Sequence, residues 1–117
     1  MAALTRADFT LEPKRVSLKD GREVVLKRLS ALERAEYLGL CKSLAEGAKT
    51  GGPVDQLKAV FIAAGSLVSL ALIDDTGTRV FQTGEEATSA LSEPLMDELC
   101  DLISDLNGLR TANDPNA

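Results

Sequence analysis

The sequence contains no histidine and no tryptophan, and only one tyrosine and three phenylalanines among 117 residues. The absence of histidine removes the side chain that most often moves protons near neutral pH. It also excludes Ser–His and Cys–His nucleophile pairs and zinc sites with histidine ligands. An enzyme that uses only carboxylates and lysines remains an alternative, but no pair of these residues forms a motif that supports it. We therefore expect a protein that is not an enzyme, with no catalytic residues, cofactor or metal.

Cysteine is scarce as well, since Cys41 and Cys100 are the only two. They lie far apart in the sequence, with no third cysteine and no C-x-x-C pair to complete a metal or redox site. We interpret both as small core residues. Residues 1–6 contain no apolar run long enough for a signal peptide, so we expect the chain to stay in a reducing cytoplasm.

The longest apolar run, residues 59–73, is shorter than the roughly 20 residues of a membrane-spanning helix. It is also interrupted by Gly65, Ser66 and Ser69, so we predict a buried core helix and no membrane contact. The helix is expected to begin at Val54 or Asp55. Because it is apolar nearly all round, it must be covered on several sides. Either it is the centre of the fold, or it shares part of its surface with another chain through self-association.

Charge is distributed unevenly along the chain, which has 13 basic and 18 acidic residues and a net charge of −5. Residues 1–42 have a net charge of +3, and residues 84–117 have a net charge of −7. An overall negative charge argues against binding to a phosphate backbone, so nucleic acid is not an expected partner. The acidic segment, residues 84–117, forms either a solvated face or a surface that selects a basic partner.

Residues 14–29 have the pattern of two short strands around the turn pair Asp20 and Gly21, which is typical of a β-hairpin. The register remains open in the sequence. A two-residue turn would pair Val16 with Val25, whereas a three-residue loop would pair Val16 with Val24. The choice decides which face of the second strand is buried.

Ser30 and Glu33 have the spacing of a capping box, which predicts the start of a helix. Apolar residues recur in it at helical spacing: Ala31, Ala35, Leu38, Cys41 and Ala45. Tyr37, Leu40 and Leu44 flank this set, so we expect one broad apolar face. We expect this helix to end near Glu46, and the glycine-rich residues 46–53 to form a flexible loop.

The second half of the chain has its own boundary signals. Residues 78–81 are expected to be extended and to add to the hairpin. Thr83 and Glu86 have capping-box spacing and predict a short helix through Leu91. A last helix is expected to begin near Pro94 and to end near Gly108.

Together these elements predict an α+β fold: a small N-terminal antiparallel β-hairpin or sheet packed with three to four helices. We expect residues 1–110 to form this single domain and residues 111–117 to form a disordered tail.

Leucines recur at steps of three and four residues along the last helix, and acidic residues occupy its other faces without compensating basic residues. As an ordinary core face, this stripe would only pack the domain. As a partner-binding surface, it would accept an amphipathic helix, and the acids would select basic partners. The candidate partner-binding residues are Leu91, Leu95, Leu99, Leu102, Leu106, Glu93, Asp97, Glu98, Asp101 and Asp105.

The order of these elements resembles that of the tail assembly chaperones of long-tailed, siphovirus-type bacteriophages and prophages, over residues 14–109. Five segments carry the resemblance: Lys19-Asp20-Gly21-Arg22-Glu23-Val24, Leu29-Ser30-Ala31-Leu32-Glu33-Arg34, Ser69-Leu70-Ala71-Leu72-Ile73-Asp74, Gly77-Thr78-Arg79-Val80-Phe81, and the leucine-rich acidic helix ending in Leu106-Asn107.

The resemblance implies a non-enzymatic role in tail morphogenesis. Members of this family keep the helical, aggregation-prone tape measure protein soluble and help to recruit the tail tube protein. They act in the host cytoplasm and are absent from the mature virion. The sequence also leaves open a different class of protein, an acidic inhibitor that mimics nucleic acid or another small interaction protein, because residues 84–117 are so acidic.

Overall fold

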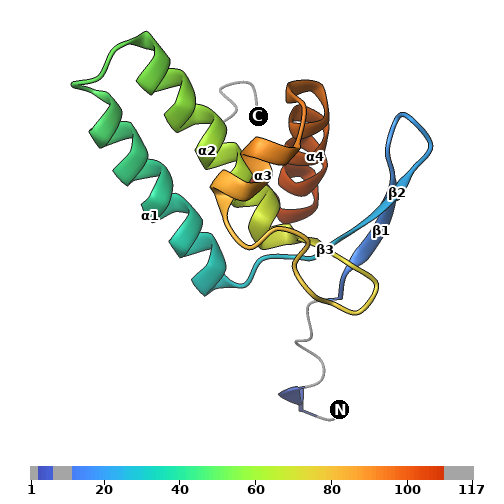
Figure 1. Cartoon of the computed structure of the whole chain (residues 1–117). Coiled ribbons are helices and arrows are strands. Elements are labelled where there is room, and N and C mark those ends of the chain that lie inside the picture. Colours follow the sequence, from blue (N-terminus) through green and yellow to red (C-terminus); the bar gives the residue numbers. More distant parts are fainter. Residues whose placement is uncertain (1–2, 7–11, 110–117) are drawn as a thin grey trace.

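The computed structural model describes residues 3–6 and 12–109. Within these residues the chain forms a three-stranded sheet and four helices, which confirms the α+β fold (Figure 1). The elements are β1 (Lys14–Ser17), β2 (Glu23–Leu26), α1 (Ala31–Ala48), α2 (Pro53–Ala71), β3 (Leu72–Ile73), α3 (Gly84–Ala90) and α4 (Glu93–Asn107). The disordered tail predicted for residues 111–117 lies outside the described residues.

The β1–β2 hairpin adopts the register of a three-residue loop, with Val16 opposite Val24. The amide of Leu18 donates to the carbonyl oxygen of Arg22 at 2.7 Å, which closes the ladder next to the turn. Gly21 has a φ of +91°, a left-handed conformation that glycine adopts without strain. In this register Leu18 and Leu26 are buried, so the hairpin presents its apolar face to the core.

The third strand corrects the sequence prediction, which interpreted the whole apolar run over residues 59–73 as helix. Helix α2 ends at Ala71, and the next two residues pair antiparallel with Val25 and Leu26. An apolar run looks the same in a helix and in a buried strand, so pairing with β2 decides where the helix ends. Of the expected strand over residues 78–81, Arg79 forms an isolated bridge to Ile73.

The boundaries of the first two helices are set by local signals. Ser30 and Glu33 form the predicted capping box: the Glu33 amide donates to Ser30 Oγ at 3.2 Å, and the Ser30 amide donates to the Glu33 carboxylate at 3.0 Å. Helix α1 extends to Ala48, two residues beyond the expected end, and α2 begins at Pro53, one residue before the expected start. The connection is therefore residues 49–52, and its flexibility remains a prediction.

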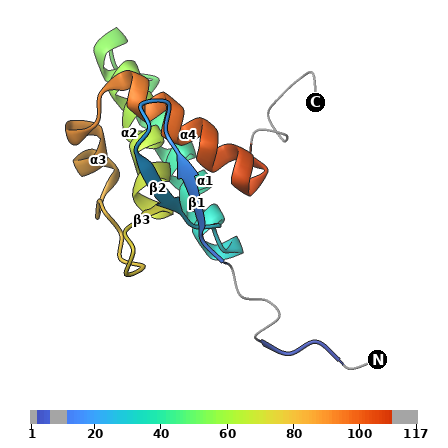
Figure 2. The same cartoon turned by 90° about the vertical axis from the view of Figure 1, so that its right-hand side faces the viewer.

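The core lies where the C-terminal half of α2 meets α3, α4 and the sheet. Leu26, Val68, Leu99 and Ile103 are its largest fully buried side chains. Figure 1 shows α2 in the middle of the fold, with α1 on one side and α4 on the other. In Figure 2 the β1–β2 hairpin lies in front of α4. The C-terminal half of α2 is thus the centre of the fold, which was one of the two alternatives for this helix.

Candidate interaction surface

Helix α1 and the first half of α2 form a helical hairpin that extends beyond the core. None of the 18 residues of α1, all of them described, is buried. The buried residues of α2 begin only at Gly65. Before that point Val54, Leu57 and Val60 are 63%, 58% and 63% exposed. Large apolar side chains with this exposure, gathered on one hairpin, are typical of a surface that another protein covers.

An open groove of about 510 Å³ runs between these two helices. Small and aliphatic side chains dominate its lining, and no charged side chain is among them: Tyr37, Cys41, Leu44, Ala45 and Ala48 of α1, and Gln56, Ala59, Val60, Ala63 and Ala64 of α2. On α1 these residues span three turns, about 16 Å. A groove floored by small side chains accepts bulky apolar side chains of a partner helix.

Helix α1 turns inward one side of the broad apolar face predicted for it. Tyr37, Cys41 and Leu44 of that face are half-buried, as is Ala48, whereas its other residues are exposed: Ala31, Ala35, Leu38, Leu40 and Ala45. Of that predicted face, Cys41 lies inward and Ala45 lies at the exposed mouth of the groove. Alternating small residues give α1 two overlapping apolar stripes, and contact with α2 selects between them.

The inner end of the groove lies where α4 crosses α2. There the Cys100 thiol donates to the carbonyl oxygen of Ala64 at 3.5 Å. Burial, together with the charges of Asp97 and Asp101, raises the pKa of the Cys100 thiol to about 11. Burial and a hydrogen bond with Cys41 likewise raise the pKa of Tyr37. Both groups therefore stay neutral near pH 7, and this end of the groove holds no charge of its own.

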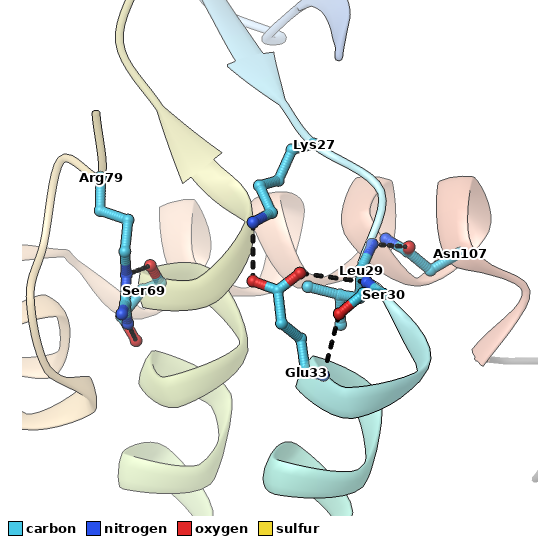
Figure 3. A network of polar contacts seen from close by, with 7 residues as sticks. All are labelled: Lys27, Leu29, Ser30, Glu33, Ser69, Arg79 and Asn107. Atoms are coloured by element: carbon cyan, nitrogen blue, oxygen red, sulfur yellow. Dashed lines mark hydrogen bonds and ion pairs between the residues drawn. The ribbon is translucent and has the colours of Figure 1, made fainter. Parts of the chain in front are cut away.

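A polar joint fixes the start of α1 relative to the sheet and to α4 (Figure 3). The Lys27 ammonium contacts the Glu33 carboxylate at 2.6 Å, and the Leu29 amide donates to Asn107 Oδ1 at 2.7 Å. The Asn107 amide group in turn donates to the carbonyl oxygen of Ile103 at 2.9 Å. These contacts set the angle at which α1 leaves the core and thus the shape of the groove.

The predicted leucine stripe of α4 faces the core. Leu99 is 2% exposed, and Leu95, Leu102 and Leu106 are partly buried and pack against the core. Leu91, which the sequence prediction placed in the stripe of the last helix, lies instead at the C-terminal cap of α3, where it also packs against the core. The structure therefore brings the stripe together as a packing face. Whether any of these residues also touches a partner remains a prediction.

The predicted acids of α4 lie outside that packing face. Four of them are exposed: Glu93, Asp97, Asp101 and Asp105. Glu98 is half-buried, and its carboxylate accepts a hydrogen bond from the Lys19 amide at 2.7 Å, which ties α4 to the hairpin turn. Glu98 therefore has a structural partner within the chain.

The sequence of α2 is apolar on all sides, and this pattern predicted that the helix must be covered. The pattern does not distinguish the half of α2 that the core buries from the half that is exposed. Helix α2 is also the one helix among the described residues that is long and apolar enough, by length and composition, to cross a membrane, with 33% of the window buried. A core helix passes the same test, and the half from Gly65 onward belongs to the core.

Among residues 3–6 and 12–109, no three His, Cys, Asp or Glu side chains gather in a way that could hold a metal ion. The arrangement offers instead an uncharged helical groove and, beside it, an acidic helix. Such a surface can bind a protein helix.

Comparison with solved structures finds a protein with a similar fold. The structure of the bacteriophage HK97 tail assembly chaperone is similar to this chain, with a TM-score of 0.60 and 18% sequence identity. The similarity covers 82% of this chain and 85% of the HK97 chain. No protein-family model matches the sequence, and no curated protein is significantly similar to it. The resemblance expected from the sequence is thus confirmed in the fold.

Proposed function

We propose that this protein is a non-catalytic tail assembly chaperone of a long-tailed bacteriophage or prophage. The fold likeness to the HK97 tail assembly chaperone supports the class. The observation that carries the proposal further is the uncharged groove between α1 and the exposed half of α2. A chaperone for apolar helices needs an open apolar surface of this kind.

The partner in this proposal is the tape measure protein, whose helices occupy the groove and are kept soluble. The second partner is the tail tube protein, which is recruited to the complex and displaces the chaperone. The protein acts in the host cytoplasm and leaves before the virion is complete. An acidic surface on α3 and α4 keeps the chaperone and its complex soluble, because net charge opposes association between copies.

Co-expression with a fragment of the cognate tape measure protein tests this proposal. The wild-type chain should raise the soluble fraction of the fragment, and Ala45→Glu should abolish the gain because it places a carboxylate at the mouth of the groove. Ala35→Glu is the matched control, since Ala35 is also an exposed alanine of α1 but does not line the groove. An unchanged soluble fraction with the wild-type chain would refute the proposal.

A further inference from the structure

The groove between α1 and α2 does not end in solvent on its inner side but at helix α4. Ala64 is the last α2 residue of the groove, and it is the residue whose carbonyl oxygen accepts the Cys100 thiol hydrogen. Helix α4 thus meets α2 at the end of the apolar lining. A helix that fills the groove to this end comes next to α4.

Acidic side chains stand beside that crossing. Asp97 is three residues before Cys100, and Glu93 is seven residues before it, so both lie on the Cys100 side of α4. The charge of Asp97 raises the pKa of the Cys100 thiol, which agrees with its proximity. Both acids are exposed. Within the residues described, neither carboxylate forms an ion pair.

The lining itself contains no charged side chain, so burying the polar face of a partner helix there would cost desolvation free energy. Only charged residues at the border of the groove can recognise charges on the partner. At the inner end the charges that act on Cys100 are those of two acids, Asp97 and Asp101. Asp97 also lines a second hollow, to which the β1–β2 turn contributes Lys19 and Arg22. A partner helix would therefore place a bulky apolar stripe in the groove and basic side chains against Glu93 and Asp97. In this arrangement the apolar contact with the groove supplies most of the affinity, and the charges of Glu93 and Asp97 supply selectivity and orientation.

We propose that the α1–α2 groove and the acidic edge of α4 form one composite site for an amphipathic helix with a bulky apolar stripe and Lys or Arg at one end of it. This inference rests on the proposed function for the identity of the groove's occupant. The composite site adds two points: which side chains select the partner helix, and which end of that helix lies against α4.

Three synthetic helical peptides of about four turns are the probes, measured by fluorescence anisotropy with the full chain. The first has leucines at i, i+4, i+7 and i+11 with lysines near one end. The second has the same leucines with glutamates in place of the lysines. The third keeps the lysines but replaces the leucines with alanines. The first should bind most tightly, and its advantage over the second should shrink as salt is added.

Asp97→Lys should weaken binding of the lysine peptide about fivefold and strengthen binding of the glutamate peptide, because one exposed attraction becomes a repulsion. Glu46→Lys is the matched control, since Glu46 is an exposed acid of α1 that does not line the groove. It should leave the preference between the peptides unchanged. Thermal unfolding of both variants checks that each is folded.

Equal binding of the lysine and glutamate peptides, or equal effects of Asp97→Lys and Glu46→Lys, would overturn the composite site. So would an alanine peptide that binds as well as the leucine peptide. These outcomes are separable from failure of the proposed function. A chain that solubilises the tape measure fragment without charge preference refutes only the composite site, whereas charge-selective peptide binding without solubilisation refutes only the chaperone role.

Discussion

Gly65 of α2 and Gly84 of α3 are in direct backbone contact. A Cβ on Gly65 would overlap the carbonyl oxygen of Gly84, and a Cβ on Gly84 would lie 2.8 Å from the carbonyl oxygen of Ile62. Glycine at both positions lets α3 approach α2 where the buried half of α2 begins. This contact marks the boundary between the part of α2 that belongs to the core and the part that is exposed.

Gly65→Ala should destabilise the protein by about 1–3 kcal/mol, because the added methyl group meets backbone atoms that cannot move freely. Urea unfolding gives the free energy of unfolding. Gly39→Ala is the matched control in α1, where a Cβ has no neighbour within 4 Å. It should stabilise the protein by about 0.5–1 kcal/mol through helix propensity. Equal effects of the two substitutions would contradict the close contact.

The packing role of the α4 leucines predicts a large stability cost at Leu99. Leu99→Ala should lower the free energy of unfolding by about 2–5 kcal/mol, because the side chain is fully buried. Leu57→Ala should change it by no more than about 0.5 kcal/mol, since Leu57 is 58% exposed. A small cost at Leu99 would show that the stripe is not a core face.

The joint at the start of α1 predicts an acid-sensitive contribution to stability. Burial alone would raise the pKa of Glu33, but hydrogen bonds from Lys27 and Ser30 outweigh it and hold the pKa below its ordinary value. The stabilisation is therefore present above the ordinary glutamate pKa of about 4.3 and is lost as the pH falls through the lower folded-state value. Glu33→Gln should reduce the difference in stability between pH 6 and pH 3, measured by urea unfolding at each pH. An unchanged difference would mean that other carboxylates carry the acid sensitivity.

The raised pKa of Cys100 predicts that its thiol is unreactive in the folded protein. At pH 8 a thiol with a pKa of about 11 is almost entirely protonated, and only the thiolate is nucleophilic. Mass spectrometry after iodoacetamide treatment should find Cys100 unmodified in buffer and modified in urea. Rapid modification of Cys100 in buffer would show that the α2–α4 crossing opens readily.

The sequence predicted the features that depend on neighbouring residues. The capping box of Ser30 and Glu33, the hairpin turn at Gly21 and the end of α4 at Gly108 are all local, and all three are present. The strand at Leu72–Ile73 was missed because it is defined by pairing with Val25 and Leu26, which lie far away in the sequence.

The candidate site was harder to predict than the fold. Leucines at helical spacing in α4 and in α2 look equally suited to a core or to a partner. The arrangement of the helices covers Leu99 and leaves Leu57 exposed. Exposure depends on how whole elements pack, and one sequence gives only the pattern within each element.

Chemical-shift mapping by NMR with a cognate tape measure fragment tests the central claim most directly. Backbone amide shifts should change along α1 from Tyr37 to Ala48 and along α2 from Gln56 to Ala64, with a smaller change near Asp97. The amides of the β1–β2 hairpin should be unaffected. Shift changes confined to the β1–β2 hairpin or to α3, or no change at saturating fragment, would contradict binding in the α1–α2 groove.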